Sequence, residues 1–385
     1  MFAKIHGARI AAIRAAVPTQ KICIEDELEY YGGSLKKAQR AKAMIGIDRR
    51  RPAWPGQTAS DLCYAAASSL LADHPDVKEN IDALIFVSQS PDYHLPATAC
   101  ILQERLGLPQ TCAAFDVNQG CAGFVYGLWL ASSLASSGCK NVLILAGDAP
   151  IWPRDASNRI IAPIFGDGGG VALVSASDSG PEITFSIGVD GSGHDVLIMP
   201  AGCTRLPFSW ENNDDNLALI EKFTDASGAS WRLYDIYMNG KKVFEFTMRV
   251  VPDHIKEFLQ QTSTSVDNID YFMLHQANRQ IVGEIAKKAG LPPEKTPSES
   301  FSKFGNLSSA SIPAAICDLF GEKGSTRNAT MLLCGYGVGL SWASCLWHSE
   351  NCDVKPVIDV PKPENAPAWK EKIKYWRDKI SGEAE

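Results

Sequence analysis

Residues 80–88, Asn80-Ile81-Asp82-Ala83-Leu84-Ile85-Phe86-Val87-Ser88, decide the fold, because the chain contains a second stretch of the same kind. Residues 268–275, Asn-Ile-Asp-Tyr-Phe-Met-Leu-His, open on the same triplet and continue as an apolar run of strand length. A helical pattern follows each stretch and leads to an apolar strand that ends on glycine, at 141–147 and at 329–335. Such self-similarity indicates a duplicated α/β unit whose equivalent loops meet across a pseudo-twofold axis.

Strand and helix patterns alternate through the first half of the chain. Apolar runs at 83–87, 114–117 and 142–145 alternate with helical patterns at 100–106 and 122–136. This alternation is typical of an α/β fold with buried sheets. We divide the chain into an N-terminal half at 1–185, a C-terminal half at 186–350, and a linker with a C-terminal helix at 351–385.

Two segments lie outside the repeat. Residues 200–237 include the run Glu-Asn-Asn-Asp-Asp-Asn at 211–216, which is too polar for a core and indicates a loop or lid beside a site. In the tail, a Pro-bearing linker at 355–367 precedes four apolar residues that share one helix face: Trp369, Ile373, Trp376 and Ile380. We expect this amphipathic helix to pack on its own domain or on a dimer partner and not on a membrane, because its polar face carries both charge signs.

The composition excludes several classes of protein. A 45% hydrophobic chain of 385 residues can bury a large core, and a net charge of -7 argues against nucleic-acid binding, which needs a dense basic face. The eleven cysteines include no CxxC pair and indicate reduced thiols, not disulfides or a zinc site. Neither a signal peptide nor a membrane span is indicated, so the expected location is the cytoplasm.

Cys121 stands where a strand pattern ends and a helical pattern begins, in the run Asp-Val-Asn-Gln-Gly-Cys-Ala-Gly-Phe at 116–124. Backbone N–H groups at a helix start stabilise a thiolate, so we expect a lowered pKa and a nucleophilic sulfur. A free cysteine is more often a small buried hydrophobe, so this position alone does not establish catalysis.

His275 and Asn306 strengthen the prediction of a catalytic site at Cys121. His275 ends the apolar strand 271–274, and functional groups of open α/β sheets gather at the carboxyl ends of strands. Taken singly, His275 could be a structural donor and Asn306 a helix N-cap. The repeat places Cys121 and Asn306 at equivalent helix starts with His275 at the strand end between them, so we expect the three to converge on one cavity.

Two glycine-rich segments have different expected roles. Residues 165–171, Phe-Gly-Asp-Gly-Gly-Gly-Val, lack the GxGxxG spacing and precede a strand, which favours a tight turn over dinucleotide binding. Residues 334–339, Cys-Gly-Tyr-Gly-Val-Gly, would let main-chain N–H groups approach a substrate carbonyl as part of an oxyanion hole. A plain strand-turn-strand connection is the other reading of this second segment.

From about residue 10 to 347 the chain resembles the β-ketoacyl-ACP synthase III family of the thiolase superfamily. The resemblance rests on the Cys121 segment and on residues 165–168, 238–244, 275–278, 305–311 and 335–342. It implies a thiolase fold, with duplicated α/β halves in a five-layered αβαβα sandwich, and a homodimer. It also implies a catalytic triad of Cys121, His275 and Asn306, and an oxyanion hole from the backbone N–H groups of Cys121 and the Gly337-Val338 loop.

The implied reaction is acyl transfer from an acyl thioester to Cys121, then decarboxylative Claisen condensation with malonyl-ACP. The 200–237 insertion and the tail exceed the compact family pattern, which suggests a specialised acyl or secondary-metabolite pathway. A cysteine thioester stays reactive, and neutral His and Asn donors stabilise charge without protonating the carbanion. No metal or organic cofactor is needed. Acyl carrier protein would dock on Arg279, Lys287 and Lys288, with Lys241 or Lys242 as additions, although a solvated helix face is the other reading.

Two positions depart from the family pattern. Acetyl-CoA-primed members carry a Trp and an Arg ahead of the glycine that matches Gly46, whereas this chain reads Arg-Ala-Lys-Ala-Met at 40–44. Leu95 replaces a bulky Phe that, in the family, reaches from the partner subunit to the end of the acyl pocket. We therefore expect poor priming by acetyl-CoA and a longer or functionalised acyl group.

Three other functions stay open. A degradative thiolase would use Cys334 as a second thiol, although thiolases carry His where this chain has Asn306. An acyltransferase would keep the acyl group on Cys121 but pass it to a hydroxyl or an amine. A non-catalytic subunit on the same fold is disfavoured by the presence of Cys121.

Overall fold

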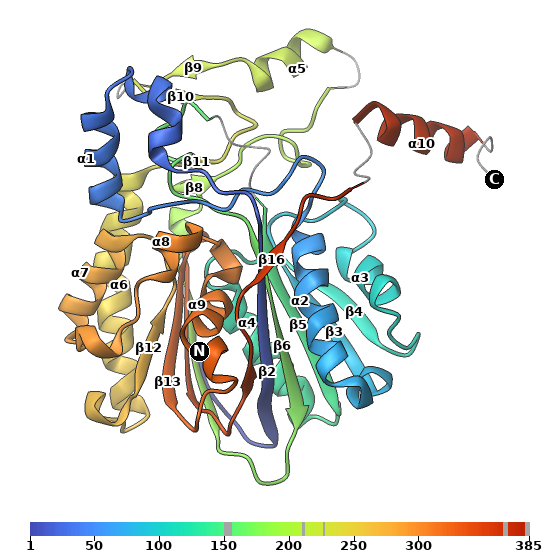
Figure 1. Cartoon of the computed structure of the whole chain (residues 1–385), viewed down its shortest axis with the longest axis vertical. Coiled ribbons are helices and arrows are strands. Elements are labelled where there is room, and N and C mark those ends of the chain that lie inside the picture. The colour runs from blue at the N-terminus through green and yellow to red at the C-terminus, as the bar shows by residue number, and fades with distance from the viewer. Residues whose placement is uncertain (150–155, 210–211, 226–227, 365–368, 382–385) are drawn as a thin grey trace.

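The computed structural model describes residues 1–149, 156–209, 212–225, 228–364 and 369–381 (Figure 1). Two β-sheets form its centre. The five-stranded sheet has the order β1 (Phe2–Ile5), β7 (Ile183–Val189), β14 (Ser341–His348), β13 (Thr330–Gly337) and β12 (Tyr271–Leu274). The seven-stranded sheet has the order β15 (Asp353–Val354), β2 (Ala8–Pro18), β6 (Gly168–Ala176), β5 (Asn141–Asp148), β3 (Ile81–Val87) and β4 (Ala113–Val117), and β16 (Ile358–Val360) also pairs with β2.

The two sheets repeat one pattern of pairing. In the larger sheet β2 and β6 are antiparallel, β6 and β5 are antiparallel, and β5 and β3 are parallel. In the smaller sheet β7, β14, β13 and β12 follow each other with the same three relations. The duplication expected from the two Asn-Ile-Asp stretches is therefore confirmed, since β3 and β12 hold equivalent places.

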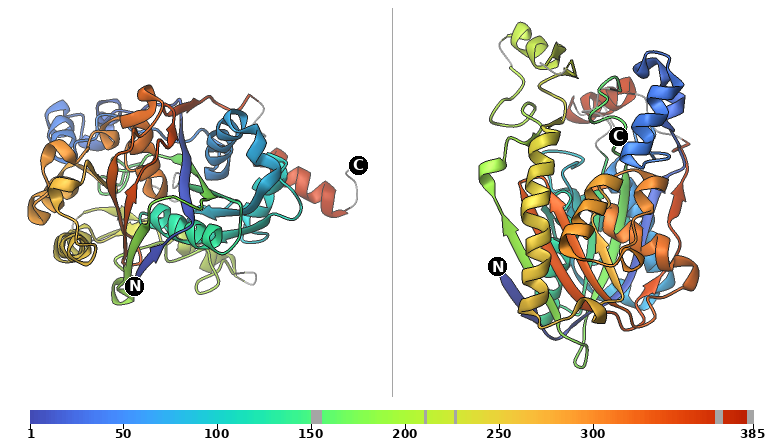
Figure 2. Two further views of the ribbon diagram at one scale, coloured as in Figure 1. Left: turned by 90° about the horizontal axis from the view of Figure 1, so that it is seen from below. Right: turned by 90° about the vertical axis from the view of Figure 1, so that its left-hand side faces the viewer.

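Helices complete five layers (Figure 2). The central helices α4 (Gly123–Ser136) and α9 (Ser311–Phe320) contact both sheets. The outer face of the larger sheet is covered by α2 (Ala59–Asp73) and α3 (Thr98–Leu106), and that of the smaller sheet by α6 (Gly240–Gln261) and α7 (Arg279–Ala289). The fold is the αβαβα sandwich that the sequence predicts. Two further helices, α1 (Leu35–Ile45) and α8 (Ser300–Phe304), lie beside α7 and α9 respectively.

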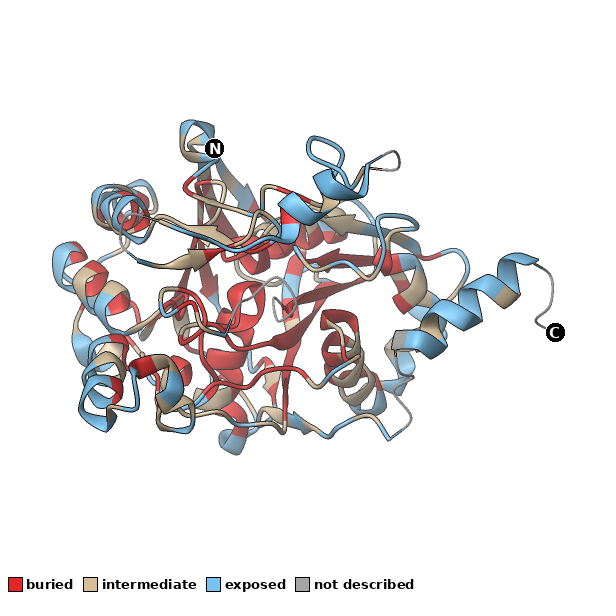
Figure 3. Ribbon diagram, turned by 90° about the horizontal axis from the view of Figure 1, so that it is seen from above, coloured by how far each residue is buried: buried red, intermediate tan, exposed pale blue. Residues whose placement is uncertain are grey.

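Burial explains the apolar character of the central elements. β5 is buried along its whole length, because helices cover both faces of its sheet, and such strands are continuously apolar instead of alternating. One core cluster joins α4 to both sheets and to α9, through Leu128, Ile144, Met273 and Ile316. The buried ribbons fill the middle of the molecule in Figure 3.

The strands cross the expected division of the chain. The boundary at 185/186 falls within β7, and β1 joins the sheet of the second half. Residues of the expected linker form β15 and β16, which pair with β2 in parallel. The division into 1–185, 186–350 and 351–385 stays a prediction.

The segment 200–237 has more regular structure than the expected loop. It contains α5 (Asn213–Ile220) and the paired strands β9 (Phe223–Thr224) and β10 (Ser230–Trp231). At its edges β8 (Leu197–Ile198) pairs with β11 (Tyr237–Met238). The polar run caps a helix here, since the side chain of Asn212 accepts a hydrogen bond from the N–H of Asp214 (3.0 Å), while Glu211 lies outside the described residues.

The tail ends in the predicted helix, α10 (Trp369–Ser381), which lies to one side of the sandwich (Figures 1 and 3). The ring of Trp376 in this helix packs edge-on against the ring of Tyr93, with 5.9 Å between the ring centroids. Linker residues 365–367 lie outside the described residues. No helix in the described part of the chain is long and apolar enough to span a membrane.

Candidate active site

Cys121 lies in the turn between β4 and α4, one residue before the N-cap Ala122. The end of β13 packs directly on this turn. A Cβ atom added to Gly337 would lie 2.9 Å from Cys121 Sγ, and one added to Gly335 would lie 2.7 Å from Ala122 Cα. Only glycine permits this approach, so the glycine-rich segment 334–339 serves more than a plain strand connection.

Two backbone N–H groups donate toward the sulfur of Cys121, its own and that of Val338. The sequence predicts that these N–H groups form an oxyanion hole, and the structure brings them together beside the thiol. Gly337 contributes by its close approach to Cys121.

The Cys121 thiol is protonated in this unacylated site. Burial raises its pKa to about 11, and the nearby carboxylate of Asp148 adds to the rise. The Ser308 hydroxyl, 3.9 Å from Sγ, and the two N–H groups offset only part of this effect. The expectation of a lowered pKa is therefore wrong for this state, because removing water from a charged sulfur outweighs the helix start.

His275 follows the last residue of β12 and is buried. Its Nδ1 atom lies 2.6 Å from Ser311 Oγ, and its carbonyl oxygen accepts a hydrogen bond from the Tyr336 hydroxyl (3.0 Å). Burial lowers the pKa of the imidazole to about 3, so the ring is neutral near pH 7. Since Ser311 occupies Nδ1, Nε2 is the ring nitrogen left for a ligand.

Asn306 is held by its backbone and by its side chain. Its N–H donates to the carbonyl of Ile164 (2.9 Å), and its carbonyl accepts from the N–H of Gly166 (3.1 Å), so the 165–171 turn supports it. Its Oδ1 accepts from the N–H of Ser308 (2.9 Å), which leaves the amide NH2 for a ligand. Asn306 is not the N-cap of α9, because that residue is Ala310.

Residues 306–311 connect the three predicted catalytic residues. The segment contains Asn306 itself, the Ser308 hydroxyl that contacts Cys121, and the Ser311 hydroxyl on His275. Sequence reasoning gave Ser308 and Ser311 no role and did not consider Asp148. The signal available was the run Ser-Ser-Ala-Ser directly after Leu307.

The remaining predicted residues lie at the surface. Leu95 is 83% exposed in the loop between β3 and α3 and does not face Cys121 of its own chain in any described contact. Arg279 begins α7, packs on Gly46 and donates to the carbonyl of Ala43 (3.3 Å). The other basic residues of the predicted docking surface are exposed on α7 and α6: Lys287, Lys288, Lys241 and Lys242. The roles of all five basic residues stay predictions.

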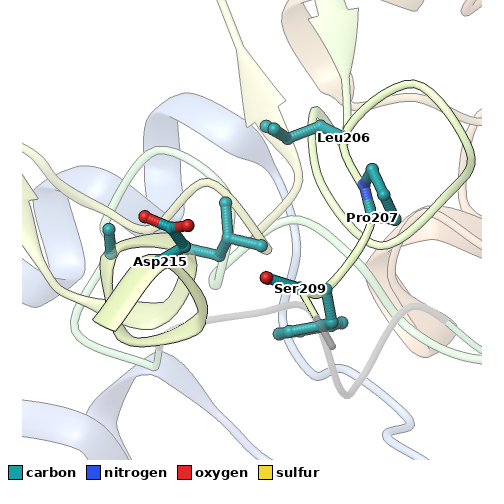
Figure 4. Close-up of a pocket in the computed structure, with 7 residues that line it drawn as sticks. Leu206, Pro207, Ser209 and Asp215 are labelled. Atoms are coloured by element: carbon teal, nitrogen blue, oxygen red, sulfur yellow. The ribbon is translucent and has the colours of Figure 1, made fainter. Parts of the chain in front are cut away.

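Two surface pockets lie apart from Cys121. One, of about 570 Å³, is formed within the 200–237 segment by Leu206, Pro207, Ser209, Asp215 and their neighbours (Figure 4). The other, of about 420 Å³, lies between α1 and α7 and is lined by Lys42, Gly46 and Arg279 among others. Among the described residues no group of three or more His, Cys, Asp or Glu side chains is placed to hold a metal ion.

Comparison with known proteins identifies the family. The model of 3-oxoacyl-[acyl-carrier-protein] synthase III matches residues 115–191, and that of its C-terminal part matches residues 259–349. A putative 3-oxoacyl-[acyl-carrier-protein] synthase 3 of Campylobacter jejuni is 34% identical over 93% of this chain and 98% of its own length. A β-ketoacyl-[acyl-carrier-protein] synthase III of Rhodopirellula baltica is 31% identical over 89% and 99%.

Solved structures agree with this assignment. The crystal structure of a 3-oxoacyl-(acyl-carrier protein) synthase from Burkholderia xenovorans superposes with a TM-score of 0.85 at 34% identity, covering 94% of this chain and 99% of that one. The repeated sheets, the buried thiol beside glycine and the matches over both halves lead to one conclusion. This chain belongs to the β-ketoacyl-acyl-carrier-protein synthase III family, whose members are acyltransferases of the thiolase fold.

Proposed function

We propose that the chain is a 3-oxoacyl-ACP synthase III-type acyltransferase that condenses an acyl group held on Cys121 with malonyl-ACP. One observation carries the proposal. The 306–311 segment holds an oriented amide, Asn306, and contacts both a neutral imidazole, His275, and the thiol of Cys121.

The first half-reaction is acyl transfer. The sulfur of Cys121 attacks the carbonyl carbon of an acyl thioester, and the resulting oxyanion accepts hydrogen bonds from the N–H groups of Cys121 and Val338. The bond from the carbonyl carbon to the donor sulfur then breaks. The donor leaves as a free thiol that carries the proton lost by Cys121, so no cofactor enters the balance.

The second half-reaction is condensation. The malonyl carboxylate leaves as CO2, and its bonding electron pair forms an enolate whose oxygen accepts from His275 Nε2–H and Asn306 Nδ2–H. The enolate carbon attacks the acyl-Cys121 carbonyl, the carbon–sulfur bond breaks, and the cysteine thiolate takes up a proton from solvent. A histidine with a pKa near 3 suits this role because it donates a hydrogen bond without delivering a proton to the carbanion.

The donor is an acyl group other than acetyl from CoA. The α1–α7 pocket, where the family pattern places Trp and Arg, offers Lys42 instead. The ammonium of Lys42 already pairs with Glu25 (3.0 Å) and Asp48 (2.5 Å), so it is engaged before any nucleotide arrives.

The enzyme acts as a homodimer. β4 ends its sheet, and it carries an exposed Phe115 along an edge that pairs with no other strand in the described residues. A second copy would cover this edge, and the exposed Leu95 would then reach the acyl pocket of the partner. Native mass measurement in solution tests the assembly.

Acidic acyl carrier protein docks on the surface of Arg279, Lys287 and Lys288. Both lysines project from the last turn of α7, and no ion pair of either is found among the described residues. Because all eleven cysteines are unpaired thiols, we place the enzyme in the reducing cytoplasm.

The thiolase alternative is disfavoured by the position of Cys334. Its side chain belongs to the apolar cluster of the outer helices α6 and α7, whereas its neighbour Leu333 faces the central layer that contains α4. A second catalytic thiol would have to face Cys121. Transfer of the acyl group to a hydroxyl or an amine remains the second candidate.

Intact-mass analysis tests the proposal in two steps. Incubation with acyl thioesters should add one acyl group to the wild type and none to Cys121→Ala. Malonyl-ACP should then discharge the acyl group as a 3-oxoacyl product. His275→Ala and Asn306→Ala should still take up the acyl group but condense at least about 100-fold more slowly, because each loses one donor to the developing charge.

Two outcomes would contradict the assignment. An adduct that persists in Cys121→Ala would exclude this nucleophile. Discharge by an alcohol or an amine, with no reaction with malonyl-ACP, would favour the acyltransferase that forms esters or amides.

A further inference from the structure

Asp148 is a buried carboxylate with no role in the mechanism above. It ends β5 and is only 3% exposed. No ion pair of Asp148 with a basic side chain is found in the described part of the chain, although a buried charge without such a partner is costly. Burial raises its pKa, and hydrogen bonds from neighbouring donors oppose that rise.

Donors from both halves of the chain converge on this carboxylate. Oδ1 accepts from the N–H of Gln89 (2.7 Å) and from the hydroxyl of Ser88 (3.3 Å), where β3 ends. Oδ2 accepts from the N–H and the hydroxyl of Ser309 (3.2 and 2.8 Å), 161 residues along the chain. Asp148 therefore joins the first half to the centre of the 306–311 segment.

Two other serines of that segment, Ser308 and Ser311, contact residues of the site. Ser308 adopts a positive φ of 50°, which non-glycine residues seldom do, and in this conformation its N–H reaches Asn306 Oδ1. Its hydroxyl contacts Cys121, while Ser311 contacts Nδ1 of His275. Ser309, which is bound by Asp148, thus lies between Ser308 and Ser311, the residues that orient Asn306 and His275.

We propose that Asp148 is a positioning residue for condensation: by holding Ser309 it fixes the 306–311 segment and, through it, the amide of Asn306 and the imidazole of His275. This inference rests on the proposed function. Only a carboxylate suits the site, because it accepts at both oxygens and the groups around it, the hydroxyl of Ser308 included, donate to it. An asparagine would turn its NH2 toward one pair of these donors.

The proposal separates the two half-reactions. Acyl uptake depends on Cys121 and on the N–H groups of Cys121 and Val338, none of which hydrogen-bonds to Asp148 in the described structure. Asp148 acts on the thiol through its charge, which raises the pKa of Cys121, so removal of that charge should not slow acyl uptake. Condensation depends on the placement of His275 and Asn306, and a displacement of about 1 Å can slow a reaction about 100-fold. Asp148→Asn should therefore take up acyl groups at no less than about one third of the wild-type rate and lose about 100-fold in kcat for condensation.

The experiment compares three variants by intact mass, by release of CO2 from malonyl-ACP, and by thermal unfolding. Ser309→Ala removes one hydroxyl from the same contact and should give a smaller loss of the same kind. The double variant Asp148→Asn/Ser309→Ala should be no slower than Asp148→Asn, since both changes break one contact. Asp353→Asn is the matched control, because it breaks the ion pair with the buried Arg14 (2.5 Å) away from the site. It should lower the thermal midpoint and leave the ratio of condensation to acyl uptake unchanged.

Equal losses of acyl uptake and condensation in Asp148→Asn, or no loss in either, would overturn the proposal. If Asp148→Asn does not fold, Ser309→Ala must still show the selective loss of condensation, and its absence there counts against the inference. Failure of the proposed function looks different, because the wild type itself would then release no CO2 from malonyl-ACP.

Discussion

The reactivity of the resting thiol tests the balance of forces at Cys121. Burial raises its pKa from the ordinary 9.0 to about 11, whereas a dominant helix start would have lowered it. A pKa of 11 leaves a thiolate fraction of about 10⁻⁴ at pH 7, against about 10⁻² for an ordinary thiol of pKa 9. The difference is about 100-fold in the reactive form, or about 2.7 kcal/mol.

The assay is alkylation of Cys121 by iodoacetamide between pH 6 and 10.5, read by peptide mass. The exposed Cys100 and Cys203 are first replaced by alanine so that they do not consume the reagent. We expect the rate at Cys121 to rise about tenfold for each pH unit, with no plateau below about pH 10. The same cysteine in urea-unfolded protein is the internal control and should level off near pH 9.

A plateau below pH 8 in the folded protein would refute the reasoning. It would show that the N–H groups of Cys121 and Val338, with the helix start, stabilise the thiolate more than burial penalises it. The site would then hold a thiolate before the donor binds, as the sequence alone suggested.

Two further predictions concern the partners of the site. Reversal of charge in Lys287→Glu/Lys288→Glu should lower turnover with carrier-protein substrates at least about tenfold at low salt, less so at high salt, and spare small thioester mimics; equal losses with both substrates would point to damaged folding. In competition among acyl donors read by intact mass, longer or functionalised acyl groups should label Cys121 ahead of acetyl-CoA, since each added methylene that is buried contributes up to about 0.8 kcal/mol. Preference for acetyl-CoA over the whole panel would refute the inference drawn from residues 40–44 and Leu95.

Local sequence patterns were sufficient to predict most of the fold. The predicted strand at 142–145 and the helix at 122–136 appear as β5 and α4, because an apolar run between turn signals is buried in the same way wherever it lies. The secondary structure of the 200–237 segment was harder to predict. Its polar residues make α5 and short strand pairs through nearby hydrogen bonds, which periodicity does not reveal.

At the site, the residue types were predictable and their surroundings were not. Cys121, His275 and Asn306 stand out by their places at strand ends and helix starts. The contacts that orient them come from hydroxyls with no periodic signal, Ser308 and Ser311, and from a carboxylate on another strand.

The sequence by itself determined the duplicated α/β order, the family and the candidate nucleophile, since each follows from short motifs that are recognisable without knowing which distant residues meet. Only the tertiary structure decided that the thiol of Cys121 is protonated, that the ring of His275 is neutral, and that Asp148 supports Ser309 across 161 residues. The physical reason is that loss of water and long-range hydrogen bonds depend on which distant groups surround an atom, and only folding brings those groups together.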